Sequence, residues 1–574
     1  MGVQGLAAFI RQFPSLANQE TWQPTTEVNE NSSPDRWIID GNAFVHFYAN
    51  QHHEYWFYGG EYANVADHLR RDIMTLQKAG LQLTFLFDGA LPADKEGTRL
   101  KRLRDSLGRV STLYDGKLSK GHSLSELYVI PPLMLDVCRQ TIAELGVPHH
   151  TCQGEADAHV MRLAHDYHGY CVSRDSDIHV CPRVGKGYIP LGTLKIEPEQ
   201  DNKVHALVYQ PEQLANLLQI DVNVLSLFGT LLGNDYVDPV RRPIEQWCTA
   251  HGVQCNNKAR MWPKHVGLFL NRISENTALE SLIGEVVSSL GIQDQQIEIR
   301  ESIRRYDPFS PLLGHQQGDI DLKQDVLAGV VGRSVSDILE SKTFWTPVFI
   351  EDLRESSSWS ISLPLRKCIY GLLVSGCDVV EYARERRHIA RFLEEGTELP
   401  SGTSPKAILY GAHHTDPDSL QADHHVVPLI LCLRYIVHQS AADENPMKRY
   451  ELIGLIAGSL GSLAPVLGLQ FQEREQSSNF WTKKRIPHLT AQFQSVVFCS
   501  HMLAQVLKIP HFAETPGFLA HMYSGKIMYR CLRGAQQLRG GIQSIVQQLV
   551  PQEARPLFTT IYEAVIQDLD TCLE

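Results

Sequence analysis

Acidic residues follow short apolar runs at several places in the first 240 residues. Asp40 ends the run Trp37–Asp40, Asp88 ends the run Leu83–Asp88, and Asp235 follows Leu231-Leu232-Gly233-Asn234. Two further acidic pairs stand in the strings GEADA and SRDSDI. The seven carboxylates are those of Asp40, Asp88, Glu155, Asp157, Asp175, Asp177 and Asp235.

Seven carboxylates that converge on one crevice would repel one another strongly unless cations neutralise them. Hard divalent cations such as Mg²⁺ and Mn²⁺ prefer oxygen ligands. Two such ions about 3.5–4 Å apart orient water and stabilise the leaving oxygen in phosphodiester hydrolysis. The pattern therefore predicts a site with two Mg²⁺ or Mn²⁺ ions, provided that the fold brings the acidic residues together.

The elements that would position these residues are short apolar strands that alternate with helices. Strands are expected at Trp37–Asp40, Leu83–Asp88 and Tyr170–Ser173, and amphipathic helices at Val65–Lys78 and Leu133–Leu145. Such runs suit a buried parallel sheet, whose ligands bind outside the carboxyl ends of the strands. We predict an α/β fold with a central, mostly parallel sheet, followed by a largely α-helical C-terminal region.

Each acidic residue also has an ordinary structural explanation. An Asp after a strand is often a helix N-cap, Glu155 and Asp157 would favour the first turn of a following helix, and Asp-Ser-Asp could form an Asx-turn. Five such features in this order are much harder to explain in that way.

Composition sets limits on the other functions. The 574 residues carry a net charge of −12, with 43% hydrophobic residues, so a uniformly basic nucleic-acid binder is excluded. The N-terminus is not expected to be a secretory signal, and the twelve scattered cysteines indicate free thiols. The apolar stretch Leu452–Gly468 contains four glycines and one proline, which favours a buried helix pair over a membrane span. Glu20–Arg36 is expected to be an exposed loop.

One segment has a strong local charge. Lys95–Lys120 holds eight basic and three acidic residues, a balance of +5. Lys101, Arg104 and Arg109 are expected to attract the phosphate backbone of a nucleic acid. The alternative is a helix whose basic face is simply solvated.

Taken together, these motifs resemble the XPG/flap endonuclease superfamily. The resemblance rests on the ordered strings MGVQGL, IIDGNAF, LFDGA, GEADA, SRDSDI and LLGNDY. The asteroid branch is the most similar, because it shares the IDG and FDG variants and a segment like Gly59–Tyr62. Arg366–Leu373 and Leu519–Gly525 look like the C-terminal region of that branch.

The resemblance implies a PIN-like nuclease domain with two metal ions. In the matched positions, the first ion would be held by Asp40, Asp88, Glu155 and Asp157, and the second by Asp175, Asp177 and Asp235.

The same resemblance implies roles for four further residues. Lys95 and Arg102 would contact the scissile phosphate, Gly2 would form a processed N-terminus beside the nucleic acid, and His46 would stack on a base. For His46, an ordinary position on a helix face remains the alternative.

Two features depart from zinc proteins and from flap endonucleases. The pairs His149-His150, His413-His414 and His424-His425 lack zinc-ligand spacing, so loop histidines are expected. No glycine hairpin for gripping duplex DNA follows Tyr236, where the sequence continues with Val237-Asp238-Pro239. A flap substrate is therefore not implied.

The sequence predicts a metal-dependent, structure-specific or single-strand nuclease that acts on single-stranded or junction-containing DNA in preference to RNA. The alternatives are a catalytically silent scaffold for RNA or protein, and a hydrolase of small phosphoesters. The retention of all seven acidic residues, together with Lys95 and Arg102, favours the enzyme. The nucleus is preferred over the cytoplasm, and no membrane association is expected. The expected domains are 1–260 (nuclease), 261–340 (helical extension) and 341–574 (asteroid-type).

Overall fold

The structure is a computed structural model of the whole chain. It describes residues 2–573 except 25–33, 116–123, 200, 235, 253–260, 274–277, 308, 310–323, 325–330, 421, 443–444, 472–484, 511, 513–514 and 539–541. Residue contacts divide the chain into two compact units. Unit 1 comprises Met1–Phe47, Arg71–Asp88 and Val147–His315, and unit 2 comprises Tyr48–Arg70, Gly89–Gly146 and Gln316–Glu574. The domain boundaries near 260 and 340 stay a prediction.

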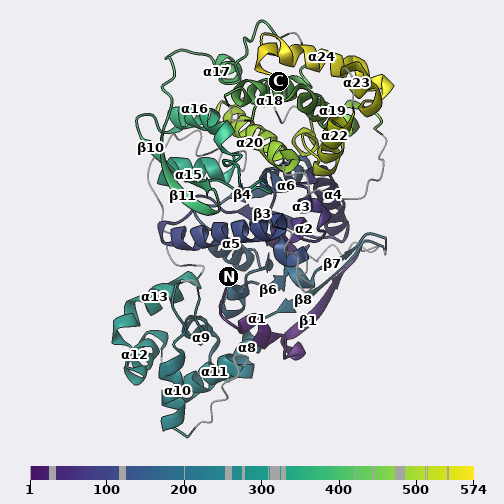
Figure 1. Cartoon of the computed structure of the whole chain (residues 1–574). Coiled ribbons are helices and arrows are strands. Elements are labelled where there is room, and N and C mark those ends of the chain that lie inside the picture. Colours follow the sequence, from purple (N-terminus) through teal and green to yellow (C-terminus); the bar gives the residue numbers. More distant parts are fainter. Residues whose placement is uncertain are drawn as a thin grey trace. The chain divides into compact units, whose positions relative to one another are not determined.

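Unit 1 is built on an eight-stranded sheet (Figure 1). Its strands are β1 (Ala17–Trp22), β2 (Arg36–Asp40), β3 (Gln82–Phe87), β4 (His149–Thr151), β5 (Tyr170–Ser173), β6 (Gly187–Pro190), β7 (Lys195–Glu197) and β8 (Lys203–Tyr209). The strand order is β1-β8-β6-β5-β2-β3-β4, and β7 pairs with β8. Pairing is parallel from β6 through to β4 and antiparallel at β8. The predicted fold class is confirmed.

The central strands form because their side chains are almost entirely apolar. In β2, Trp37, Ile38 and Ile39 are buried, as are four successive residues of β5. Both predicted helices are present, as α4 (Tyr62–Lys78) and α6 (Met134–Glu144). The sequence therefore located the sheet centre and these helices to within a few residues.

Strand β1 corrects one expectation, because Glu20–Trp22 belongs to a strand and not to a loop. Glu20 lies opposite Ala206 of β8 and Trp22 opposite Val204, in antiparallel register. The strand is mostly exposed, so its sequence is polar, but Trp22 is buried edge-to-face on Trp37 at 5.1 Å between ring centroids. Residues 25–33 of the expected loop lie outside the described part of the chain.

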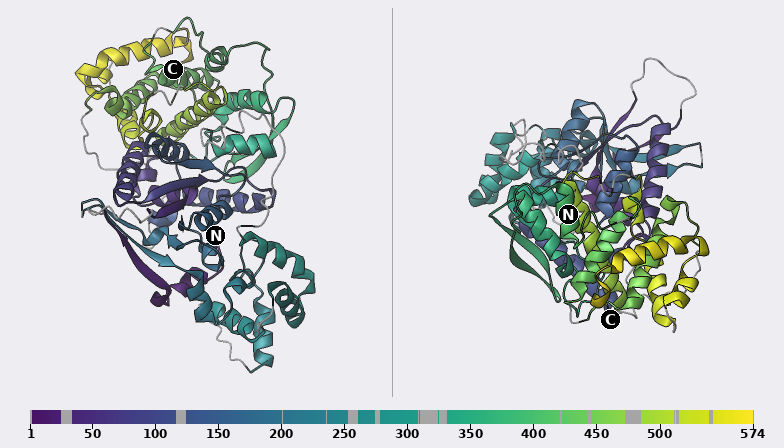
Figure 2. Two further views of the ribbon diagram at one scale, coloured as in Figure 1. Left: turned by 180° about the vertical axis from the view of Figure 1, so that it is seen from behind. Right: turned by 90° about the horizontal axis from the view of Figure 1, so that it is seen from above.

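Helices follow the sheet in unit 1. They are α7 (Asp157–Asp166), α8 (Pro211–Leu218), α9 (Leu225–Leu232), α10 (Arg241–Ala250), α11 (Trp262–Ile273), α12 (Leu279–Leu290) and α13 (Gln296–Arg305), after the N-terminal α1 (Leu6–Ile10) and α2 (Gly41–Ala49). Figure 2 shows α10 to α13, in teal, gathered in one group. Their apolar faces share one core with the side of the sheet that contains Ile38 and Cys171.

Unit 2 is largely helical and contains a small sheet. Its sheet has the order β11-β10-β9, from β9 (Thr343–Trp345), β10 (Asp378–Glu385) and β11 (His388–Glu395). Besides α6, its longer helices are α5 (Glu96–Tyr114), α15 (Arg333–Ser341), α16 (Leu363–Leu373), α17 (Pro405–Ala412), α18 (Val427–Ser440), α19 (Arg449–Leu467), α20 (Arg485–Val506), α22 (Gly525–Gln537), α23 (Ile542–Leu549) and α24 (Arg555–Ile566).

Helix α19 corrects a second expectation, since the apolar stretch from Leu452 forms one continuous helix and not a helix pair. It is the one described helix that is long and apolar enough to cross a membrane by itself, but 78% of that window is buried inside the protein. A Cβ on Gly454 or Gly458 would lie within 3 Å of Leu532 or Met528 of α22. The glycines therefore permit two helices to pack closely.

A polar contact joins the early and late parts of unit 2. The buried Glu61 carboxylate accepts hydrogen bonds from Ser524 Oγ at 2.7 Å and from the backbone N–H of Lys526 at 2.6 Å. The Gly525 N–H donates to the carbonyl of Gly60 at 2.9 Å. Glu61 thus caps the start of α22 from the other end of the sequence.

Candidate active site

Asp40 and Asp88 stand at the carboxyl ends of the adjacent parallel strands β2 and β3. Asp40 is 7% exposed, and its two oxygens accept hydrogen bonds from the Ala43 N–H at 2.9 Å and from Ser173 Oγ at 2.8 Å. Ser173 ends β5, the neighbour of β2 on its other side. Asp40 is therefore both the cap of α2 and a fixed acidic group at the centre of the sheet edge.

Asp88 connects this edge to the GEADA segment. Its Oδ1 accepts a hydrogen bond from the Ala156 N–H at 2.9 Å, while its own N–H donates to Asn42 Oδ1 at 3.1 Å. Ala156 is the N-cap of α7, whose first residue is Asp157. The start of α7, with Glu155 and Asp157, is thereby attached to the end of β3.

The Asp-Ser-Asp motif forms the turn that follows β5. Asp175 caps the short helix η4 (Ser176–Val180) by accepting from the Asp177 N–H at 3.1 Å. Gly2 lies against this turn, since a Cβ at position 2 would be 2.3 Å from Ser176 Oγ and 2.7 Å from Asp175 Oδ1. The Asx-turn alternative is thus correct as geometry, and it places the acidic residues beside the N-terminal segment.

The pKa shifts show that these carboxylates share one electrostatic field. The pKa of Asp40 is raised to about 7, first by burial and then by the negative charge of Asp88, with a smaller contribution from Asp175. The pKa of Asp157 is raised well above its usual value, again first by burial and then by its acidic neighbours. Those neighbours are Asp175, Asp40, Asp88 and Glu155.

The structure therefore brings Asp40, Asp88, Glu155, Asp157 and Asp175 together, while their role as metal ligands stays a prediction. At Asp40, protein groups only partly offset the unfavourable burial and repulsion, because the hydrogen bonds to this carboxylate lower its pKa less than burial and neighbouring charge raise it. Carboxylate oxygens in excess of positive charge are the donor set that a hard divalent cation requires. Asp235 lies outside the described residues.

Among the described residues, no three carboxylates at the sheet edge lie close enough to share one ion. In the described part of the chain, three ligand atoms mutually within 4.8 Å occur only at Asp423, His424 and His425. The carboxylates at the sheet edge are thus near enough to shift one another's pKa, but they do not form a closed set of three ligands. A bound cation would offset the repulsion between these carboxylates.

The loop after α9 is held by residues that the sequence did not identify. Asn234 Nδ2 donates to Ser302 Oγ at 2.8 Å and to the Tyr306 hydroxyl at 2.7 Å, both at the end of α13. The Asn234 Oδ1 accepts from the N–H groups of Tyr236 and Val237, at 2.9 Å each. Helix α13 therefore fixes Asn234, and Asn234 in turn fixes the backbone of Tyr236 and Val237.

The same helix reaches the acidic cluster through an aromatic ring. The Tyr236 hydroxyl donates to Glu155 Oε2 at 3.5 Å, and the Arg305 guanidinium lies over the Tyr236 ring at 3.8 Å. The negative charges of Asp177 and Asp175, after burial, raise the pKa of Tyr306. The sequence signal for α13, an amphipathic helix with two Arg at its end, is too general to have revealed this contact.

Lys95 and Arg102, which are predicted to contact the scissile phosphate, belong to unit 2. Lys95 is buried, at 8% exposure, and is the N-cap of α5, whereas Arg102 is exposed. Lys101 and Arg104 are exposed as expected, but Arg109 is half-buried and donates to Ser106 Oγ at 2.8 Å. Their roles remain predictions, as does base stacking by His46, which is half-buried on α2 in unit 1.

The histidine pairs are more ordered than loop histidines. His149 and His150 lie on β4, and His413 is fully buried, with its ring nitrogens 2.7 Å from the Leu409 carbonyl and 2.7 Å from Ser500 Oγ. The expectation of loops was therefore wrong for His149 and His150, whereas His413 and His414 do lie in the turn that follows α17.

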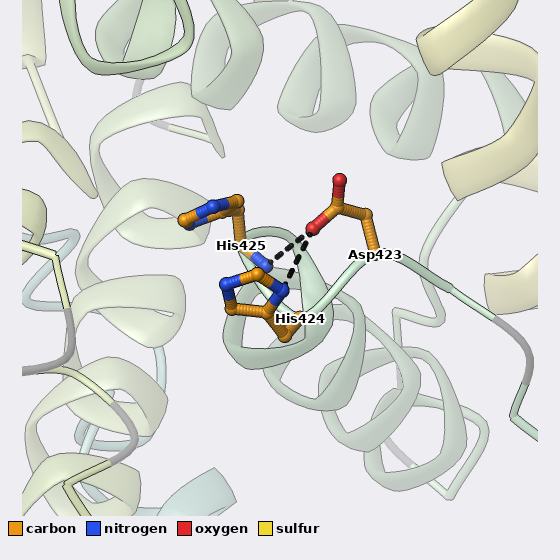
Figure 3. Close-up of side chains that lie close together, drawn as sticks. All are labelled: Asp423, His424 and His425. Carbon is orange, nitrogen blue, oxygen red and sulfur yellow. Dashed lines mark hydrogen bonds and ion pairs between the residues drawn. The ribbon is translucent and has the colours of Figure 1, made fainter.

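The third pair is the exposed group near the start of α18. Figure 3 shows that His424 faces the Asp423 carboxylate, 3.2 Å from Nδ1 to Oδ1, while the His425 ring turns away. His425 Nδ1 is instead 3.0 Å from Thr515 Oγ1. Both rings are satisfied by local partners.

Comparison with known proteins gives relatives of the predicted kind. No family model matches the chain. The chain is 25% identical over 406 residues to the human protein named single-strand DNA endonuclease ASTE1, a match that covers 65% of this chain and 56% of that protein. It is 22% identical over 346 residues to the Drosophila melanogaster protein asteroid, covering 50% of this chain and 38% of that protein. The resemblance to the asteroid branch is confirmed.

A third relative is named as a coactivator and not as a nuclease. The human constitutive coactivator of peroxisome proliferator-activated receptor gamma is 25% identical over 247 residues, covering 41% of this chain and 26% of that protein. Among solved structures, the catalytic core of Rad2 in complex with a DNA substrate aligns with a TM-score of 0.30 at 17% identity, covering 56% of this chain and 91% of that one. The chain thus spans little more than half the length of the curated endonuclease that it matches.

Proposed function

We propose that this protein is a divalent-metal-dependent nuclease that hydrolyses phosphodiester bonds. The observation that carries the proposal is the convergence of Asp40, Asp88, Asp157 and Asp175 at one edge of a parallel sheet. There the charges of Asp88 and Asp175 raise the pKa of Asp40, and those of Asp40, Asp88 and Asp175 raise the pKa of Asp157. Buried charge without a compensating partner lowers the free energy of unfolding, so stability alone does not explain this cluster. The relative named single-strand DNA endonuclease supports the proposal.

In this proposal the metal is Mg²⁺ or Mn²⁺, as two ions. Asp40, Asp88, Glu155 and Asp157 would hold the first ion, and Asp175, Asp177 and Asp235 the second. When bound, the ions would polarise the phosphodiester, lower the pKa of attacking water and stabilise the leaving oxygen.

The side chains around the ligands have positioning tasks. Ser173 and the Ala43 N–H fix both oxygens of Asp40, which leaves its remaining lone pairs for a cation. Gly2 allows the N-terminal segment to approach Asp175 and Asp177 more closely than any side chain would permit. Lys95 and Arg102 would neutralise the scissile phosphate as its charge increases.

For the substrate we propose single-stranded or junction-containing DNA in preference to RNA. The name of the endonuclease relative supports this choice. The absence of a glycine hairpin after Tyr236 in the sequence argues only against a flap substrate. The nucleus is the proposed compartment, because it contains that substrate.

A catalytically silent scaffold is the second candidate. The relative that is named as a receptor coactivator favours it. Seven filled carboxylate positions oppose it, because a scaffold has no need to retain buried acidic groups that repel one another.

The test is cleavage of end-labelled single-stranded, duplex, overhang and flap oligonucleotides, in DNA and RNA, with Mg²⁺ or Mn²⁺. Asp175→Asn should abolish cleavage and leave binding intact. Asp166→Asn is the matched control, because Asp166 is exposed and ends α7, nine residues after Asp157, or about 14 Å along the helix. Full activity of a folded Asp175→Asn protein would refute the two-metal assignment. Binding without cleavage by the wild type would favour the scaffold.

A further inference from the structure

Helix α5 carries both predicted phosphate ligands, and its sequence is a poor one for an independent helix. Its 19 residues include Gly97 in the first turn and Gly108 in the interior, where a Gly costs about 1 kcal/mol relative to Ala. Helices of this length are marginal in water without tertiary partners. Arg102 lies seven positions after Lys95, so the two are about 10 Å apart along one side of the helix only while it is intact.

The partners of α5 include residues from far along the chain. At the N-terminal end, the Tyr382 hydroxyl of β10 donates to Glu96 Oε1. The Tyr382 ring is buried and stacked on Trp345 of β9, 4.2 Å away and within 9° of parallel. Asp337 of α15 accepts from the Leu91 N–H at 2.7 Å, just before the helix begins.

The C-terminal end of α5 is bound in the same way. Arg387, between β10 and β11, donates to both oxygens of Asp115 at 2.9 and 3.0 Å and to Ser111 Oγ at 2.9 Å. Asp115 is the C-cap of α5. The Tyr114 hydroxyl donates to Asp352 Oδ1. Bidentate arginine pairs of this kind fix orientation as well as adding energy.

The flank of the helix completes the contact. Leu103, Leu107 and Val110 are buried at helical spacing, and strand β11 lies beside α5 (Figure 1). Lys101, Arg102 and Arg104 remain exposed. The C-terminal region therefore holds one face and both ends of α5 and leaves the basic face open.

We propose that Asp337, Asp352, Tyr382 and Arg387 form a clamp that holds α5 in the position in which Lys95 and Arg102 act on the substrate. The clamp residues are positioning residues that do not touch the substrate. This inference rests on the proposed nuclease function, and it assigns a task to the C-terminal half of the chain. It also predicts that α5 is fully formed before nucleic acid binds.

The experiment combines two substitutions, one at each end of α5. Tyr382→Phe removes the hydroxyl bound to Glu96 and keeps the stack on Trp345, and Arg387→Met removes the pair with Asp115. The control is Arg449→Met, which breaks an arginine–aspartate pair of 2.6 Å with Asp570, away from α5. Metal-induced stabilisation should be unchanged in all variants, because the carboxylates belong to unit 1.

The first readout is hydrogen exchange of residues 96–114 without nucleic acid. Loss of the hydrogen bond to the Glu96 carboxylate and of the Arg387 contacts with Asp115 and Ser111 should speed this exchange about ten- to a hundredfold in the double variant and leave it unchanged in the control. Unchanged exchange of α5 in the double variant would overturn the proposal.

The second readout is cleavage, in the wild-type and Lys95→Ala backgrounds. The clamp variant should lower kcat about tenfold or more in the wild-type background but much less in Lys95→Ala, because the clamp acts through Lys95 and its neighbour Arg102. Equal losses in both backgrounds, or faster exchange with full cleavage, would show that the contacts only stabilise the fold. If the wild type cleaves no substrate, the proposed nuclease function is refuted, and the proposed positioning role is refuted with it. Hydrogen exchange of residues 96–114 would still show whether the clamp residues hold α5 in place.

Discussion

Replacing Asp40 by Asn should make the protein more stable while it destroys cleavage. Asp40 is buried, and its pKa is raised from 3.8 to about 7 by that burial and by Asp88. Asn keeps the hydrogen bonds, because its carbonyl can accept from the Ala43 N–H and its amide can donate to Ser173 Oγ. The substitution therefore removes the charge and little else.

The magnitude follows from the pKa shift. A folded pKa about three units above the unfolded value means that ionised Asp40 reduces the free energy of unfolding by up to about 4 kcal/mol. The sign is that of a raised carboxylate: the stability of the wild type is complete below about pH 4 and is lost as the pH rises through about 7. In Asp40→Asn that loss is absent, so its advantage should increase between pH 4 and 7 and then level off.

The assay is thermal unfolding of the wild type and Asp40→Asn at several pH values, first with a chelator and then with Mg²⁺. Without metal at pH 8 the variant should melt several degrees higher. Mg²⁺ should raise the midpoint of the wild type and have little effect on the variant, because a bound ion offsets the repulsion only where its ligands are ionised. A variant that melts at or below the wild-type temperature in chelator at pH 8 would refute the reasoning.

Two further substitutions test contacts described above. Gly525→Ala should destabilise unit 2 by several kcal/mol, because the added Cβ would lie 2.0 Å from the carbonyl oxygen of Tyr58; chemical denaturation measures this, and wild-type stability would contradict the close packing. Tyr306→Phe removes one of two acceptors of Asn234 Nδ2 and should cost about 1 kcal/mol and lower the cleavage rate more than substrate affinity. Weakened affinity with an unchanged rate would instead place Tyr306 in substrate binding.

The sequence predicted the parts of the site that depend on local pattern. An apolar run followed by an acidic residue identifies both a buried strand and its carboxyl end, so Asp40, Asp88 and Asp175 could be placed on one sheet edge without coordinates. The Asp175 turn was also recognisable, because an Asx-turn involves only three consecutive residues.

The missed features depend on partners that are distant in sequence. The contact of Asn234 with Tyr306 joins residues 72 positions apart, and neither residue has an unusual local setting. Strand β1 was missed because an exposed strand has polar residues, and only its pairing with β8 defines it. The break predicted within α19 was wrong because the glycines there serve packing against α22, which the sequence of α19 alone does not show.

The contact between Glu61 and Ser524 has a consequence for synthesis on the ribosome. The two residues are 463 positions apart. At a synthesis rate of about 5–20 residues per second, Ser524 is added on the order of a minute after Glu61. The strands of unit 1 are complete once Tyr209 has emerged, whereas α5 cannot meet Arg387 until much later. A nascent chain would therefore assemble its carboxylates well before its basic helix is secured.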